Sequence, residues 1–228
     1  MRFFLLALPV FLLAACSGPR ETETTGAFDA RAWLAEARTT GADTMTTLPS
    51  YDDPRVARMR ALADPLDAAV GWRLACDTFR DPDTGVVIVD SSGDASRSWP
   101  RATFFIRDFG RDEALVAVTC DYGAYQGYYA IARLHGRDAS LLTTPVFGPS
   151  GTISDRRTSQ FSTLVAVNPA ARTFTTFALA RGLGDCGERA TYLVEGDAAD
   201  PSQIRARDCD SPEPHTTSES WPVVFPAR

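Results

Sequence analysis

The sequence contains no lysine, so all 23 of its basic residues are arginines, and 29 acidic residues bring the formal net charge to −6 at pH 7. We interpret the missing lysine as the codon bias of a GC-rich genome and not as a binding pattern. Proteins that bind DNA or RNA usually carry an excess of positive charge on one face. The acidic balance therefore argues against a nucleic-acid partner.

Histidine is also scarce, because His135 and His215 are the only two. A Ser-His-Asp hydrolase needs a histidine base beside a nucleophile, but the sequence has no Gly-x-Ser-x-Gly motif. Two histidines far apart in the chain also make a poor metal site. We therefore predict two solvent-exposed loop histidines, no catalytic residue, no metal and no cofactor.

No Cys-x-x-Cys pair occurs, so the sequence does not indicate thioredoxin-like redox chemistry or a Cys-rich zinc site. Apart from Cys16, which ends the N-terminal leader, the cysteines are Cys76, Cys120, Cys186 and Cys209. An even number of cysteines in an oxidising compartment indicates two disulfides, and four cysteines allow three pairings.

The leader itself has the features of a secretory signal over residues 1–15: a positive charge at Arg2, the short apolar run Phe3–Leu13 and small residues before Cys16. A transmembrane helix needs about 20 apolar residues. The Leu-Ala-Ala-Cys motif resembles the bacterial lipobox, in which the cysteine is acylated with chains such as palmitate and becomes the new N-terminus. Ser17 after the cysteine favours the outer membrane. The alternative is an ordinary signal peptide with a chance cysteine.

Residues 16–27 are small and polar, as is typical of a flexible tether between a lipid anchor and a domain. Apolar residues at helical spacing then predict a helical segment over residues 28–70, with helices at Asp29–Arg38 and Asp53–Val70. We expect Pro65 to break or kink the second helix, because proline lacks a backbone donor and clashes with the preceding turn.

From residue 71 onward, short β-branched and aromatic runs alternate with Gly, Pro, Asp and Asn, which is typical of antiparallel strands joined by hairpins. We predict a mainly β fold, an antiparallel sheet or sandwich-like domain over residues 71–228, with a turn at Asn168–Ala171. The predicted strands are Val86–Val89, Ala102–Arg107, Leu115–Thr119, Tyr128–Leu134, Phe161–Val167, Thr173–Leu179, Thr191–Val194, Ile204–Arg207 and Val223–Phe225. Pairing of Thr191–Val194 with Ile204–Arg207 would bring Cys186 and Cys209 together, so we predict a bridge between them.

Four segments, taken in order, resemble a known family: Leu74–Asp77, Thr119–Tyr125, Arg181–Gly187 and Trp221–Val224. The chain is similar over residues 71–228 to secreted proteobacterial proteins that share a domain of unknown function, the one numbered 1176. Such proteins often carry another cysteine soon after the position of Cys76, and this chain does not. The resemblance therefore implies a Cys76–Cys120 bridge. It implies no activity, because none is established for the family.

Three motifs have both a functional and a structural interpretation. The run Arg181–Gly187 could form an active-site loop, but its glycines favour a sharp turn beside a disulfide. The acidic run Asp81–Gly85 has the spacing of the first ligands of an EF-hand calcium loop. It lacks the glutamate that ends such a loop, so an ordinary turn is favoured. The tyrosines Tyr122, Tyr125, Tyr128 and Tyr129 form a candidate contact patch, and core packing is the alternative.

Together these observations predict an outer-membrane lipoprotein whose non-enzymatic periplasmic β-domain binds a protein or a cell-envelope ligand. A periplasmic hydrolase with an unrecognised active site is the alternative. A pocket lined by carboxylates with raised pKa values would favour the hydrolase.

Overall fold

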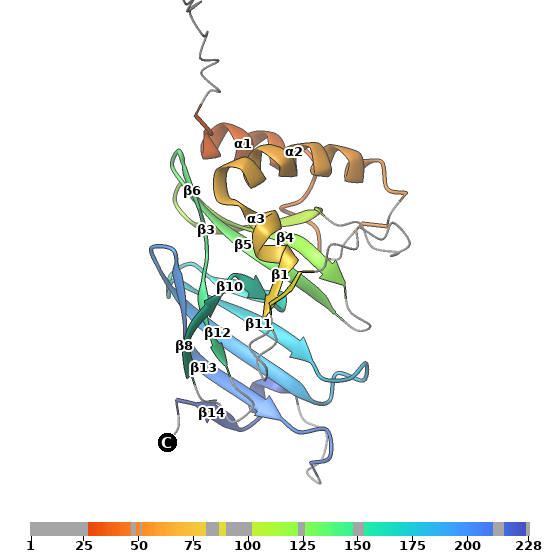
Figure 1. Ribbon diagram of the computed structural model, residues 1–228, viewed down its shortest axis with the longest axis vertical. Helices are drawn as coiled ribbons and strands as arrows, with labels where there is room; N and C mark the ends of the chain where they lie inside the picture. Colours follow the sequence, from red (N-terminus) through yellow and green to blue (C-terminus); the bar gives the residue numbers. More distant parts are fainter. Residues whose placement is uncertain are drawn as a thin grey trace, which may run out of the picture.

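The computed structural model describes residues 27–46, 49–50, 52–80, 87–89, 102–122, 126–147, 153–211 and 217–226. This part of the chain is mainly β, as predicted, with two antiparallel sheets stacked below a helical layer (Figure 1). The helices are α1 (Ala30–Arg38), α2 (Arg55–Val70), α3 (Trp72–Asp77) and the short 3-10 helix η1 (Ser218–Ser220).

The first sheet has the strand order β3-β4-β5-β6, with β9 also paired to β5. Its strands are β3 (Phe104–Gly110), β4 (Glu113–Tyr122), β5 (Gly127–His135), β6 (Asp138–Leu141) and β9 (Gln160–Phe161). The second sheet is a meander in the order β10-β11-β12-β13-β14. Its strands are β10 (Thr163–Asn168), β11 (Thr173–Leu179), β12 (Gly187–Glu195), β13 (Ala198–Arg207) and β14 (Val223–Phe225).

Two small ribbons complete the described structure, β1 (Thr78–Arg80) with β2 (Val87–Val89), and β7 (Thr144–Phe147) with β8 (Ile153–Thr158). The predicted strands at Thr173–Leu179 and Val223–Phe225 match β11 and β14, and the turn predicted at Asn168–Ala171 joins β10 to β11. The sequence did not predict α3, because Trp72–Asp77 is too short to show helical periodicity.

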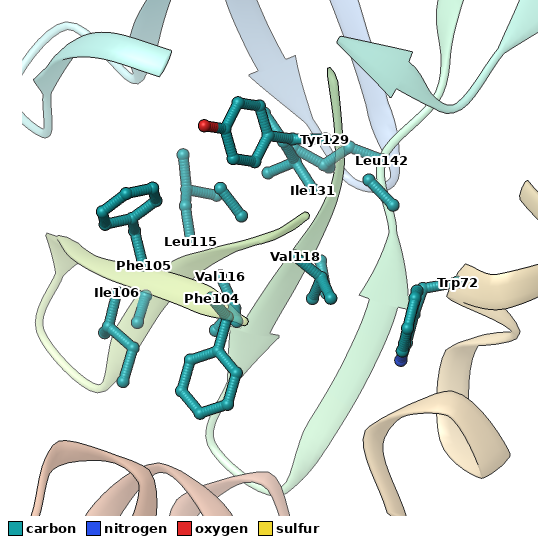
Figure 2. Close-up of a cluster of buried hydrophobic side chains, with 14 of the residues drawn as sticks. Trp72, Phe104, Phe105, Ile106, Leu115, Val116, Val118, Tyr129, Ile131 and Leu142 are labelled. Atoms are coloured by element: carbon teal, nitrogen blue, oxygen red, sulfur yellow. The ribbon is translucent and has the colours of Figure 1, made fainter. Parts of the chain in front are cut away.

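Both faces of the first sheet are covered, which explains the unbroken apolar run in β4. Phe104 and Ile106 point toward the helices, where the Trp33 ring lies 5.3 Å from the Phe104 ring, while Phe105 and Tyr129 point toward the second sheet (Figure 2). Burial of side chains on both faces makes this sheet the centre of the hydrophobic core.

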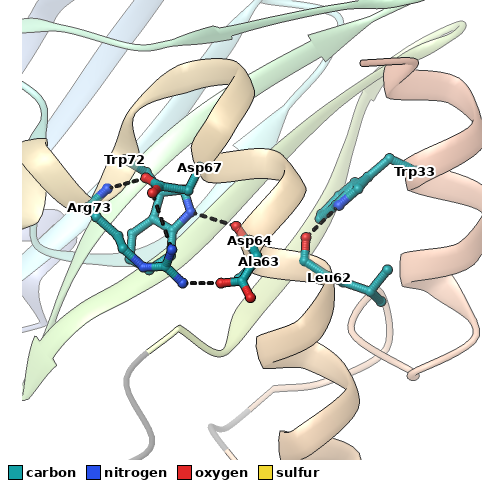
Figure 3. A network of polar contacts seen from close by, with 7 residues as sticks. All are labelled: Trp33, Leu62, Ala63, Asp64, Asp67, Trp72 and Arg73. Carbon is teal, nitrogen blue, oxygen red and sulfur yellow. Dashed lines mark hydrogen bonds and ion pairs between the residues drawn. The ribbon is translucent and has the colours of Figure 1, made fainter. Parts of the chain in front are cut away.

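Pro65 lies inside α2 and neither breaks nor ends it, so of the two expected outcomes, a break or a kink, the break is wrong. Two indole N–H groups donate to backbone carbonyls in the turn before the proline: Trp33 to Leu62 at 2.7 Å, and Trp72 to Ala63 at 3.0 Å (Figure 3). Backbone groups disturbed by a proline need other partners when they are buried. The N–H that Pro65 lacks would have bonded to the carbonyl of Ala61, so the two indoles do not replace that bond. They instead tie this turn of α2 to α1 and α3.

The connection from α2 to α3 is fixed by charged groups. Asp67 accepts hydrogen bonds from the backbone N–H of Arg73 at 2.8 Å and from its guanidinium at 3.2 Å, and Asp64 pairs with the same guanidinium (Figure 3). Gly71 ends α2 with φ +67°, a conformation that favours glycine. The Trp72 indole is thereby held against the first sheet.

An ion-pair network and an aromatic cluster join the two sheets. Glu113, at the start of β4, accepts hydrogen bonds from Arg133 of β5 and from Arg172, which lies in the β10–β11 turn. Phe161, Phe174 and Tyr192 pack together with ring centroids 5.1–5.5 Å apart. Since these side chains are contributed by strands of both sheets, the sheets share one core.

Candidate binding surface

The β11–β12 connection presents an exposed apolar side chain. We call residues Arg181–Gly187 the contact loop. Its tip consists of Gly182 and Leu183, and the Leu183 side chain is 79% exposed, more than any other large apolar residue that the structure describes. Exposed leucines are common on protein surfaces, so this one is informative only if the loop holds it in place.

Hydrogen bonds within the contact loop fix its shape. The guanidinium of Arg181 makes two parallel bonds to the Asp185 carboxylate, at 2.8 and 2.5 Å. Inside this clamp, the backbone N–H of Gly184 donates to the carbonyl of Arg181 at 3.2 Å. Bidentate arginine–carboxylate pairs have a strict geometry, so the tip is held between two fixed residues.

A disulfide fixes the base of the contact loop. Cys186 is fully buried and bonded to Cys209, with 4.9 Å between their Cα atoms. Pairing of Gly187 with Arg207 brings the ends of β12 and β13 together, as the predicted hairpin requires. The predicted Cys186–Cys209 bridge is therefore confirmed. The predicted Cys76–Cys120 bridge is also present, with 5.0 Å between the Cα atoms.

Two of the three glycines in the loop have a backbone reason to be glycine. Gly184 has φ +70°, and a Cβ on Gly187 would lie 2.0 Å from the carbonyl oxygen of Ala178. Gly182 has no positive φ. It stands beside Leu183 at the exposed tip, where the missing side chain leaves the leucine accessible. The interpretation of Arg181–Gly187 as a turn beside a disulfide is confirmed. The turn geometry does not by itself require an exposed apolar residue such as Leu183.

The contact loop lies next to part of the predicted tyrosine patch. The side chain of Gln126 links the two: its Oε1 accepts from the backbone N–H of Leu179 at 2.5 Å, and its Nε2 donates to the hydroxyl of Tyr128 at 3.2 Å. Leu179 ends the strand that leads into the loop, and Tyr128 is 37% exposed. Gln126 thus links Tyr128 to the strand that leads into the contact loop.

Tyr129 does not belong to this surface, and its place in the predicted patch is corrected. It is 3% exposed and its ring packs 6.0 Å from that of Phe105. Successive side chains of a strand point to opposite faces, so Tyr128 and Tyr129 cannot both be exposed here. Tyr125 and the side chain of Tyr122 lie outside the described residues.

The surroundings of the contact loop are acidic. Asp208 and Asp210 flank Cys209 and are exposed. The pKa of Arg181 is raised, chiefly by its hydrogen bonds with Asp185 and additionally by the nearby charge of Asp210. Arg181 and Asp185 neutralise each other. Within the part of the chain that the structure describes, Asp208 and Asp210 then remain as exposed charges beside the loop.

Comparison with known proteins identifies the family. The chain belongs to the family of proteins of unknown function DUF1176, whose model matches residues 88–228. No curated protein and no solved structure matches it. The family match confirms the resemblance seen in the sequence, and it includes both sheets, Tyr128 and the contact loop, whereas the three α-helices precede it.

Other sites considered from the sequence fall into two groups. His135 is exposed at the end of β5, consistent with a solvated histidine. Cys16, Asp81–Gly85 and His215 lie outside the described residues. Within the described ranges, no group of His, Cys, Asp and Glu side chains could hold a metal ion, and no helix is both long and apolar enough to cross a membrane.

One carboxyl group has an altered acidity that the sequence did not signal. Burial raises the pKa of Glu188 on β12, and the negative charge of this group helps raise the pKa of the buried Tyr192, after burial itself. A carboxyl with a raised pKa can act as a general acid. Its position on an inward-facing side chain of β12 could not be assigned from the sequence, because Gly187–Arg189 carry no strand pattern.

A cavity of about 350 Å³ lies between α1 and the ends of β3, β4 and β5. Charged residues at its wall are already paired: Arg38 with Asp108, and Arg31 with Asp112 at 3.8 Å. The carboxylate of Glu113 is held by Arg133 and Arg172. The cavity therefore offers a small space with balanced charge, and it is separate from the contact loop.

Proposed function

We propose that the protein is anchored to the outer membrane by acyl chains on Cys16 and faces the periplasm. The leader motif supports the anchor, since its small residues end at a cysteine. Two disulfides support an oxidising compartment, because structural disulfides rarely persist in the cytosol. Several acyl chains on one cysteine give stable anchoring where a single chain would not.

We further propose that the β-domain acts by binding, through the contact loop and Tyr128. The observation that carries this proposal is an apolar side chain, Leu183, exposed at 79% on a loop clamped at both ends. Full burial of a leucine contributes about 1.5–3 kcal/mol. A preformed loop loses little conformational entropy on association, so most of that free energy remains available for binding.

The chemistry of the tip favours a protein over a cell-wall glycan as the ligand. Leu183 would fill an apolar pocket, and Tyr128 adds an aromatic surface with a polar hydroxyl. Apolar anchors surrounded by polar groups are typical of protein–protein contacts. A glycan would be expected to meet a more polar set of side chains.

The anchor is tested with Cys16→Ala. Cells are fed an alkyne fatty acid, and labelling and membrane association of the protein are compared between the original chain and the variant. We expect both to be lost in Cys16→Ala. Unchanged labelling would show that Cys16 carries no lipid.

The binding surface is tested by photo-crosslinking in the native host. The photoreactive residue p-benzoylphenylalanine replaces Leu183 in the full-length lipoprotein, or replaces Leu193 as the control, which is 36% exposed at the other end of β12. We expect a discrete adduct with another protein from position 183 and none from position 193. Equal adducts, or none from position 183, would refute the proposed surface.

A periplasmic hydrolase is the second candidate, because burial raises the pKa of Glu188. Incubation of the purified chain with peptidoglycan or casein tests it, with Glu188→Gln as the comparison. Release of soluble fragments that is lost in Glu188→Gln would favour the hydrolase. We expect no release from either protein.

A further inference from the structure

Two exposed aspartates beside the contact loop indicate what kind of protein the loop binds. We define the acidic frame as Asp208 and Asp210. We propose that the partner is a basic protein, in which an apolar pocket for Leu183 is bordered by positively charged side chains that face the acidic frame. This inference rests on the proposed function and adds the class of partner to it.

The frame and the tip form one rigid unit. Cys209 lies between the two aspartates and is bonded to Cys186 of the contact loop, with 4.9 Å between the Cα atoms. The backbone N–H of Ala180 donates to the carbonyl of Cys186 at 3.2 Å and closes the loop at its base. A partner that accepts Leu183 therefore comes close to both aspartates.

Among the described residues, the arginine nearest the tip is already paired with a carboxylate of the loop. Arg181 is bound by the Asp185 carboxylate through two hydrogen bonds, which neutralises that pair. Arg207, which precedes the acidic frame, is 8% exposed and already has a partner. An incoming surface consequently meets two exposed carboxylates on the segment that the disulfide joins to the base of the contact loop.

Charge complementarity of this kind mainly increases the rate at which two proteins associate. Opposite charges on two surfaces raise the rate of encounter by 10-fold or more at low ionic strength, and salt weakens the effect. The screening length is about 8 Å at 0.15 M salt, comparable with the short distance across such a contact. Like charges would instead repel, so an acidic partner does not fit this surface.

The test uses the crosslinker at position 183 in full-length lipoprotein, in envelope vesicles from the native host, illuminated briefly at increasing NaCl concentrations. Asp208→Asn with Asp210→Asn removes the acidic frame. The matched control, Glu195→Gln with Asp197→Asn, removes the same charge from the exposed β12–β13 turn at the opposite end of these strands. Mass spectrometry identifies the trapped protein and gives its net charge from its sequence.

We expect a trapped protein with net positive charge. We also expect an adduct yield about 3–10 times lower without the acidic frame at low salt, and equal yields from both chains at high salt. The control variant should behave as the original chain. An adduct whose partner is acidic, or whose yield ignores both salt and the frame, would overturn the basic-partner inference and leave binding through Leu183 standing. Absence of any adduct at position 183 would overturn the proposed binding function as well.

Discussion

The first and second sheets differ in how their side chains are covered. In the first sheet, the central strand β4 is buried on both faces, by helices on one side and by the second sheet on the other. In the second sheet, β12 alternates between buried side chains such as Tyr192 and exposed ones such as Leu193. The first sheet is therefore central to stability, while the second has surface and loops available for contact.

The two sheets also differ in whether a partly or fully buried glutamate has cationic partners. Glu113 in the first sheet is 6% exposed and held by two arginines. Glu188 in the second sheet has a pKa raised by burial alone. The comparison teaches that the junction between the sheets is electrostatically satisfied, whereas the second sheet has a carboxyl group that folding does not favour in its charged form.

The largest effect is expected from comparing Phe104→Ala with Leu183→Ala. Phe104 is fully buried against Trp33, so its truncation should lower the free energy of unfolding by about 3–5 kcal/mol. Leu183 is mostly exposed, and its truncation should change that free energy by less than about 0.5 kcal/mol. Urea unfolding followed by circular dichroism measures both. Similar losses of unfolding free energy in the two variants would contradict the claim that the first sheet is central to stability and that Leu183 is not.

Replacing both Cys186 and Cys209 with serine should have the next largest effect. The bridge spans 23 residues, and loops of this size gain about 3 kcal/mol from closure in the chain-entropy model. The contact loop should also lose its fixed shape, so crosslinking from position 183 should fall. Thermal unfolding and adduct yield are measured together. A variant with unchanged crosslinking would show that the loop does not need the bridge to bind.

Glu113→Gln should destabilise the junction by about 1–3 kcal/mol, because Arg133 and Arg172 lose a shared carboxylate. Burial alone would raise the pKa of Glu113, but hydrogen bonds from the two arginines outweigh it and lower the pKa. This contribution is present above the ordinary carboxyl pKa near 4.3 and is lost as pH falls through the lowered value. Unfolding curves from pH 7 to pH 3 should show less acid dependence in Glu113→Gln than in the original chain. Equal acid dependence would contradict the assignment.

The smallest change in the free energy of unfolding is expected from Glu188→Gln, which should raise it where Glu113→Gln lowers it. Because the folded state raises the pKa of Glu188, stability falls as pH rises from about 4.3 through the raised value. The neutral glutamine should therefore stabilise the chain at pH 8 by less than about 1 kcal/mol and make no difference at pH 4. Urea unfolding at the two pH values decides this. A loss of stability at pH 8 would mean that the charged carboxylate is stabilising.

The sequence predicts much of this fold because its strands carry local signals. The strands Thr173–Leu179 and Val223–Phe225 were bounded by turn residues, and the hairpin between Cys186 and Cys209 followed from two β-branched runs. Helix α2 shows the limit of such signals. Pro65 is a local breaker, yet α2 continues through it, and the turn before it accepts hydrogen bonds from the indoles of Trp33 and Trp72, which lie outside this helix.

The candidate binding surface was only partly predictable for the same reason. The sequence singled out both the tyrosine segment and the Gly-rich run, but their meeting depends on Gln126 and on sheet pairing. It could not separate Tyr128 from Tyr129, because the register of β5 decides which ring is buried. The sequence also did not show that Leu183 is exposed between the two residues of the Arg181–Asp185 pair.

The most direct test of the account separates binding from folding at one position. The photo-crosslinker is placed at position 128, which Gln126 links to the strand entering the contact loop. Three full-length chains are compared: with Leu183 intact, with Leu183→Asp and with the control Leu193→Asp. Adduct yield in the envelope and the unfolding temperature of each purified chain are measured side by side. We predict that Leu183→Asp abolishes the adduct without lowering the unfolding temperature, while Leu193→Asp retains the adduct. An adduct that persists in Leu183→Asp, or one that disappears only because that chain unfolds, would contradict the claim that Leu183 is a binding residue.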